Sequence, residues 1–147
     1  MKKLLLTLVA GLMACAVTAR AESAWGTDLT TALAAAKKAK QHVLLDFTGS
    51  DWCPPCKKLK ADVFDSKEFA DYAGKNFKLV EVDFPRTKKL PAERAKANGA
   101  LQSKYNIEGY PTVIVLNGEG KEVWRNVGYL PGGPKVWIEK FDEARKK

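Results

Sequence analysis

The sequence has few of the side chains that metal sites require. It contains a single histidine, His42, three cysteines and two methionines, Met1 and Met13. A structural zinc site takes four cysteine or histidine ligands, and only one closely spaced cysteine pair is present here. The sequence also contains no phosphate-binding loop, no cluster of metal ligands and no serine-triad motif. We therefore expect neither a metal site nor a cofactor.

Long hydrophobic runs are scarce as well. The one candidate, residues 4–19, has 16 residues, whereas a membrane span takes roughly 20. Two lysines precede this run, and Ala19-Arg20-Ala21 ends it with small residues at the two positions that a signal peptidase recognises. This layout is typical of a secretory signal peptide. We therefore expect residues 1–21 to be a signal peptide and the protein to be periplasmic or secreted.

A lipoprotein is the alternative at this end of the chain. Leu12-Met13-Ala14-Cys15 resembles a lipobox, in which Cys15 would become the lipid-bearing first residue. Met13 fits that motif poorly, and the apolar run continues past Cys15.

Residues 22–147 have the length of one domain and contain no internal repeat or low-complexity segment. Cleavage after residue 21 would leave 22 basic and 17 acidic residues, a net charge of +5. Scattered basic residues are typical of a solvated surface, so we expect no nucleic-acid partner after export. We expect a monomer.

Hydrophobic spacing predicts helices that alternate with short strands. Helices are predicted at residues 29–40, 54–60, 65–74, 91–97, 100–105 and 132–141, and strands at residues 42–47, 77–84, 113–116 and 122–127. Asp65 with Glu68 is expected to cap the third helix, and Asn117–Gly120 to form a hairpin turn. This order predicts an α/β fold with a mostly parallel central sheet, an antiparallel hairpin at one edge and helices on both faces.

Cys53 and Cys56 form a C-x-x-C pair at the start of a predicted helix. Such a pair is a redox centre, half of a zinc site or a structural disulfide. A bridge that closes a loop of two residues stabilises a fold only slightly, which argues against a purely structural role. At a helix N-terminus the dipole and the free N–H groups stabilise a thiolate, so Cys53 is the expected nucleophile and Cys56 the resolving thiol.

Two motifs extend this interpretation to a family. Asp46-Phe47 precedes Trp52-Cys53-Pro54-Pro55-Cys56-Lys57, and Gly109-Tyr110-Pro111-Thr112 follows about 55 residues later, before Asn117-Gly118. With this order and separation, nearly all of residues 22–147 resembles the thioredoxins, in particular their exported bacterial relatives. The resemblance implies a thioredoxin fold and a thiol-disulfide oxidoreductase. It also implies protein disulfides or thiols as substrates and an upstream redox partner in the membrane or envelope.

The resemblance implies a role for each site residue. Cys53 would attack and Cys56 would resolve, while Pro111 would be a cis-proline whose loop, with Tyr110, lays a substrate strand beside the sulfurs. Trp52 would shield the site. Asp46 would lie beneath Cys56 and handle its proton; a strand carboxylate held by hydrogen bonds elsewhere is the alternative for Asp46.

Three residues adjoining the cysteines bear on the direction of the reaction. Pro54 and Pro55 remove two N–H groups that a helix start would aim at the Cys53 sulfur, which favours a reductant or isomerase over a strong oxidant. Lys57 lies within a turn of the pair and would restore part of the lost stabilisation of the thiolate.

The sequence departs from the thioredoxin pattern at three places. Residues 49–51 separate Thr48 from Trp52, one residue more than is usual. Leu79 takes the position at which thioredoxins often carry a lysine near the buried aspartate. Residues 85–97 are basic and longer than the usual connection, and behind a parallel strand they would border the active site and steer acidic partners toward it.

A binding module is the alternative function. Two thiolates suit copper(I), and the same fold can serve as a non-catalytic scaffold. Both methionines precede residue 22, so none remains to assist copper binding. Trp124, Trp137 and Phe141 are expected to pack in or on the core, and His42 to be structural or to face solvent.

Overall fold

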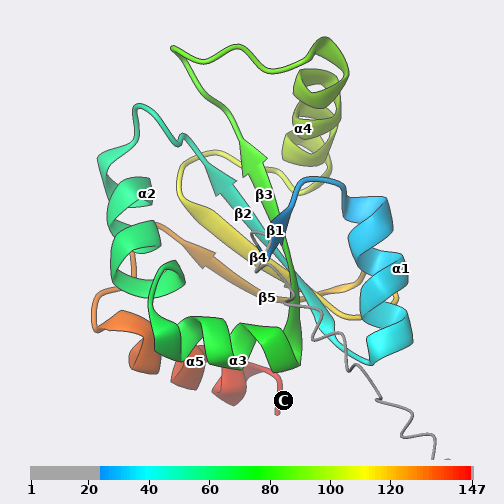
Figure 1. Ribbon diagram of the computed structural model, residues 1–147, viewed down its shortest axis with the longest axis vertical. Coiled ribbons are helices and arrows are strands. Elements are labelled where there is room, and N and C mark those ends of the chain that lie inside the picture. Colours follow the sequence, from blue (N-terminus) through cyan, green and yellow to red (C-terminus); the bar gives the residue numbers. More distant parts are fainter. Residues whose placement is uncertain (1–23, 147) are drawn as a thin grey trace, which may run out of the picture.

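The computed structural model describes residues 24–146 (Figure 1). The predicted signal peptide, with the Cys15 alternative, lies outside these residues. The strands are β1 (Trp25–Gly26), β2 (His42–Thr48), β3 (Phe77–Asp83), β4 (Thr112–Leu116) and β5 (Glu122–Val127). The helices are α1 (Leu29–Ala39), α2 (Pro54–Leu59), the π-helical turn η1 (Lys60–Phe64), α3 (Lys67–Asn76), α4 (Ala92–Lys104) and α5 (Gly133–Ala144).

The five strands form one sheet in the order β1-β3-β2-β4-β5. β3 runs parallel to both β1 and β2, whereas β4 is antiparallel to β2 and β5 is antiparallel to β4. The predicted α/β architecture, with parallel strands at the centre and an antiparallel hairpin at one edge, is confirmed. The sequence-based prediction missed β1, which adds two residues to the parallel side.

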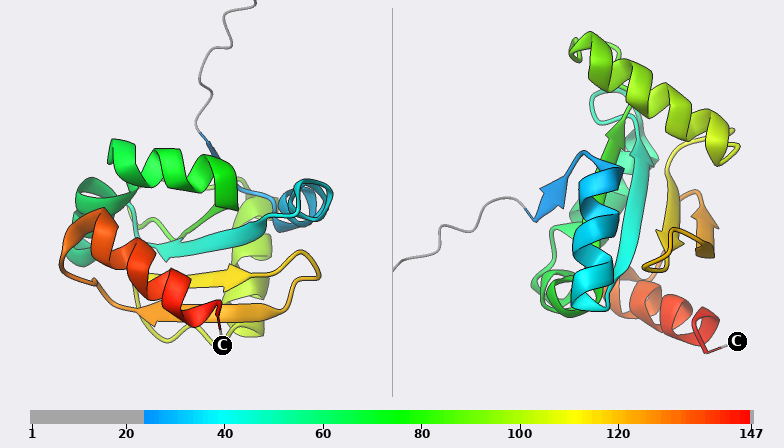
Figure 2. Two further views of the ribbon diagram at one scale, coloured as in Figure 1. Left: turned by 90° about the horizontal axis from the view of Figure 1, so that it is seen from below. Right: turned by 90° about the vertical axis from the view of Figure 1, so that its right-hand side faces the viewer.

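Helices cover both faces of this sheet (Figures 1 and 2). Side chains of β2 alternate between the faces, because Val43, Leu45 and Phe47 pack with α1 and α4, whereas Leu44 packs with α3 and α5. Asp46 follows Leu44 on the second face, toward α2 and η1. The alternation therefore places this carboxylate on the side of the sheet that carries the cysteine pair.

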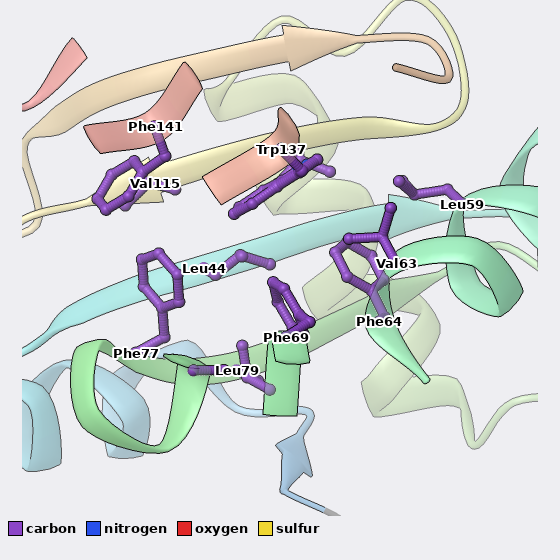
Figure 3. Close-up of a cluster of buried hydrophobic side chains, with 12 residues drawn as sticks. Leu44, Leu59, Val63, Phe64, Phe69, Phe77, Leu79, Val115, Trp137 and Phe141 are labelled. Carbon is purple, nitrogen blue, oxygen red and sulfur yellow. The ribbon is translucent and has the colours of Figure 1, made fainter. Parts of the chain in front are cut away.

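The core beneath α3 and α5 is aromatic (Figure 3). Trp137 and Phe141 of α5 are fully buried, and the Trp137 ring lies 5.4 Å from that of Phe69 and 4.9 Å from that of Trp124. The half-buried His42 ring packs edge-on against Phe141 at 5.6 Å. The expected packing roles of these aromatic residues are confirmed, and His42 is structural.

Two helix starts differ from the predictions. Ser66, not Asp65, caps α3, because Ser66 is extended and its Oγ accepts from the Phe69 N–H at 3.1 Å, while Asp65 still belongs to the preceding turn. Pro91 is likewise extended and precedes α4, which starts at Ala92. α4 then continues unbroken where the sequence predicted two helical segments.

No helix within residues 24–146 is long and apolar enough to cross a membrane.

Candidate active site

Cys53 and Cys56 are joined by a disulfide at the start of α2. Cys53 is the extended N-cap residue of this helix, and its Sγ accepts from the Cys56 N–H at 3.3 Å. Pro54 and Pro55 occupy the first helical positions, where a missing N–H costs no intrahelical bond. The two cysteines are 2% and 4% exposed, so the pair is almost enclosed by neighbouring side chains.

The predicted cis-proline lies at the same end of the sheet. The Tyr110–Pro111 peptide bond is cis, and Pro111 immediately precedes β4. Thr112 at the start of β4 pairs with Phe47 at the end of β2, which leads through residues 48–52 to Cys53. The antiparallel pairing of β2 and β4 thus brings the proline loop to the end of the sheet where the cysteine segment begins.

Trp52 makes four contacts that hold its side chain in place. Its Nε1 donates to the Phe84 carbonyl at 2.7 Å, and its ring meets that of Tyr110 edge-on at 5.8 Å. The guanidinium carbon of Arg86 lies 3.7 Å from the centre of the indole. The ring also lies against Gly49, where an added Cβ would come within 2.5 Å of it. These contacts fix the indole beside Cys53.

Asp46 is a buried carboxylate with an unusual environment. It is 7% exposed, and its Oδ1 has no hydrogen-bond partner among the described residues. Burial and then the carboxylates of Glu81 and Asp83 together raise the pKa of Asp46 to about 8, and the Lys60 ammonium opposes them. Asp46 is therefore largely protonated near neutral pH.

The ionisable neighbours of Asp46 differ from the sequence-based expectation. Leu79 pairs with Leu44 in the register of β2 and β3, and the residue beside Asp46 is Glu81. The nearby cation comes instead from Lys60 of η1. Asp46, Glu81 and Lys60 border a cavity of about 180 Å³. Its other lining residues are Trp25, Gly26, Thr27 and Phe64. Leu79 is therefore not the residue beside Asp46, and only the register of β2 and β3 shows that Glu81 takes this place.

Lys57 does not point at the disulfide. Its Nζ donates to the Asp51 carbonyl at 3.0 Å, on the turn that precedes the motif. Lys58, next in the helix, pairs with Asp62 at 2.7 Å. The site residues predicted from the sequence lie at one end of the sheet. Lys57 lies at the periphery of this site, with its ammonium group turned toward Asp51.

Sequence reasoning missed Lys60 and Glu81, and it placed residues 85–97 beside the active site without the contact between Arg86 and Trp52. The longer segment before Trp52 gave a signal of this contact, because the carboxylate of Asp51 in that segment accepts hydrogen bonds from the backbone of residues 86–88. No signal marked the other two. Among residues 24–146, no three His, Cys, Asp or Glu side chains gather in a way that could hold a metal ion.

Known proteins share this arrangement. Residues 29–140 match the family described as thioredoxin-like domain. The chain is 36% identical over 115 residues to the disulfide bond reductase DsbH of Chlamydia pneumoniae, covering 78% of this chain and 69% of that protein. It is 35% identical over 101 residues to the thioredoxin-related protein DsbJ of the same organism, covering 69% of this chain but 29% of DsbJ.

A solved structure titled DsbH oxidoreductase superposes with a TM-score of 0.77, at 35% identity, over 83% of each chain. The family match, residues 29–140, includes strands β2 to β5 and the segment that holds the cysteine pair. The chain therefore belongs to the thioredoxin-like family of thiol-disulfide oxidoreductases.

Proposed function

We propose that the protein reduces or isomerises disulfides of exported proteins and is not a strong oxidant. The observation that carries this proposal is that few backbone N–H groups can donate to the Cys53 sulfur. The Cys56 N–H donates to it, and the two residues between them are prolines, which have no N–H. Fewer donors leave the thiolate less stable, and a dithiol whose thiolate is less stable is a stronger reductant. The name of the related disulfide bond reductase supports the same direction.

The proposed reaction is a pair of thiol-disulfide exchanges. The Cys53 thiolate attacks one sulfur of a client disulfide, forms a mixed disulfide and expels the other client sulfur as a thiolate, which takes up a proton. Cys56 then loses its proton and attacks Cys53, which releases the second client thiolate. The client gains two electrons and two protons, and the protein is left with the Cys53–Cys56 disulfide.

The ionised form of Asp46, which is the smaller fraction near neutral pH, is the proposed acceptor of the Cys56 proton. It lies on the face of β2 that is turned toward α2, and its raised pKa makes the carboxylate a stronger base than an ordinary aspartate. Tyr110 and Pro111 are the proposed substrate-binding residues, because their loop shares one end of the sheet with Cys53. Trp52 would screen the exchanging sulfurs from water.

We further propose that the protein acts in the periplasm or outside the cell as a monomer. The support is the signal-peptide pattern of residues 1–21. A redox partner in the membrane or envelope would return the disulfide to the dithiol. Mass spectrometry of the exported protein is expected to find Glu22 as its first residue, whereas a lipid on Cys15 would contradict this proposal.

Equilibration with glutathione buffers tests the direction of the reaction. We expect a reduction potential near the roughly −270 mV of thioredoxin and far from the roughly −120 mV of the strongest periplasmic oxidant. A potential above about −150 mV would contradict the proposal. Insulin reduction measured beside a copper(I) titration distinguishes the enzyme from a soft-metal carrier, because only the enzyme turns over.

A further inference from the structure

The two places where the chain is longer than a typical thioredoxin are bonded to each other. Asp51, within the longer segment before Trp52, accepts from the backbone N–H groups of Arg86, Thr87 and Lys88 at 3.0, 2.7 and 3.1 Å. A hydrogen bond from the Thr87 hydroxyl, together with these backbone bonds, holds the pKa of Asp51 well below its usual range. The long connection after β3 is therefore anchored to the turn that carries the cysteines (Figure 1).

This anchor places positive charge beside Cys53. The Arg86 guanidinium stacks on Trp52, the residue that precedes Cys53, in the geometry of a cation–π contact. Arg86, Lys88 and Lys89 are all exposed, and within residues 24–146 their side chains form no ion pair. The Asp51 carboxylate is bound to the backbone of the loop and not to these side chains, so the three cations remain available to a partner.

A pocket of about 200 Å³ lies under the same connection. It is lined by Asp83, Phe84, Pro85, Lys88, Leu90, Ala95 and Asn98. The Phe84 ring contacts Tyr110 at 5.3 Å, and Tyr110 in turn contacts Trp52, so the pocket continues an aromatic row that starts at the cysteines. The pocket therefore combines an apolar wall with a cation.

The polar side of the pocket has an unused acceptor. Asn98 is 2% exposed; its Nδ2 donates to the Asp83 carbonyl at 2.8 Å, while its Oδ1 has no partner among the described residues. Asp83 itself is occupied, because its carboxylate accepts from the Ser50 N–H and hydroxyl. A buried acceptor without a partner is costly, and this one lies on a residue that lines the pocket.

We propose that residues 84–90 form a recognition rim for clients that carry an apolar side chain next to an acidic one, close to the cysteine that Cys53 attacks. The apolar side chain enters the pocket and the carboxylate pairs with Arg86 or Lys88. This inference rests on the proposed oxidoreductase function and adds a substrate class to it. Glu93, Arg94 and Lys96 of α4 follow the rim in the sequence; with Asp51 and Asp83 included, three carboxylates stand against the five cations Arg86, Lys88, Lys89, Arg94 and Lys96, so the net charge is positive.

Disulfide-linked peptide dimers provide the test. Each peptide carries one cysteine and one Leu-Glu, Leu-Gln or Ala-Glu pair, which precedes the cysteine in one series of dimers and follows it in a second series. The reduced protein is mixed with each dimer, and the released peptide thiols are measured in acid-quenched samples. In one of the two series we expect the Leu-Glu dimer to react about fivefold faster than the Leu-Gln dimer at low salt. The difference is expected to vanish at about 0.5 M salt, where the Debye length is only a few Å. The Ala-Glu dimer is expected to react about tenfold more slowly than the Leu-Glu dimer.

Two variants separate a positioned rim from a general charge effect. Lys88→Gln with Lys89→Gln should reduce the preference for Leu-Glu, because Arg86 alone then remains to pair with the carboxylate, whereas the matched exposed pair Lys37→Gln with Lys38→Gln on α1 should keep it. Asp51→Ala makes the protein more positive, so attraction by net charge alone would strengthen the preference for Leu-Glu. The same variant removes the anchor of the loop, so a positioned rim would lose part of this preference. We expect the weaker preference.

The outcomes distinguish this inference from the function on which it rests. If the protein reduces no dimer, the proposed oxidoreductase function fails. If all dimers react at equal rates in the parent protein, or if Asp51→Ala strengthens the preference for Leu-Glu, the function stands and the recognition rim is overturned.

Discussion

Asp46 and Glu81 occupy paired positions on the adjacent parallel strands β2 and β3, and their two carboxyl groups border one cavity between the sheet and η1. The pKa of Glu81 is raised as well, chiefly by burial and then by Asp83. Two such groups in one partly enclosed space disfavour ionisation of both, and Lys60 is the cation that opposes this effect. The cavity therefore controls whether Asp46 can accept a proton near neutral pH.

Glu81→Gln and Lys60→Met are expected to move the pKa of Asp46 in opposite directions. Removing the Glu81 charge should lower it, and removing the Lys60 charge should raise it, because these groups act on Asp46 through their charges. NMR titration of the aspartate carboxyl carbon measures both shifts. Lys67→Met, on the surface of α3, is the control and should leave the Asp46 titration unchanged; shifts of the same sign in the two cavity variants would contradict the assignment.

The stability of the oxidised protein should fall as pH rises toward 8. The pKa of Asp46 is raised from 3.8 to about 8 in the folded state, so this state binds the proton more tightly than the unfolded state does. The resulting stabilisation is complete below pH 3.8 and is lost as pH rises through about 8.

Asp46→Asn cannot ionise and should therefore unfold with a free energy about 2–5 kcal/mol higher than the parent protein at pH 9, with little difference near pH 4. Urea unfolding at both pH values measures this. Asp71→Asn, at an exposed position on α3, should show no comparable gain at pH 9. A gain of equal size at both pH values would mean that ionisation of Asp46 is not the cause.

Substitutions of the two cysteines should differ in the intermediates they accumulate. Cys56→Ser leaves Cys53 able to attack but removes the thiol that releases the client, so mixed disulfides should accumulate. Cys53→Ser should accumulate none, because Cys53 is the N-cap residue of α2, where the helix N-terminus stabilises its thiolate as the attacking group. Non-reducing gels of both variants give the answer, and equal trapping by the two would reverse or abolish the assigned roles.

Gly49→Ala should disturb Trp52. A Cβ at Gly49 would lie 2.5 to 2.7 Å from three atoms of the indole, so the ring must move away from Phe84 and Arg86. We expect a loss of about 1–3 kcal/mol in the free energy of unfolding and a change in tryptophan fluorescence.

Gly74→Ala is the matched control for this substitution. A Cβ at Gly74 meets nothing within 4 Å, and the residue lies inside α3. Alanine favours a helix over glycine by about 0.5–1 kcal/mol, so this variant should be as stable as the parent protein or more stable. Equal losses in the two variants would show that the contact with Trp52 is not responsible.

Local patterns were sufficient for most of the fold. The helices and strands follow from hydrophobic spacing, which is a property of neighbouring residues, and the errors fall at their ends. Ser66 and Asp65 are both good helix caps, and only the backbone conformation of the preceding π-helical turn decides between them. β1 was not predicted because a strand of two residues is too short to show hydrophobic periodicity.

The sequence by itself determined the cysteine pair, the helix start that holds it and the proline loop, since each is a short motif whose chemistry lies in adjacent residues. Only the tertiary structure decided which groups surround them. Glu81 meets Asp46 through the register of two strands, Lys60 joins them from a helical turn, and Asp51 meets residues 86–88 across 35 to 37 positions of the chain. Such contacts depend on how strands align and where a loop returns, which are set by packing of the whole domain and leave no pattern in any one segment.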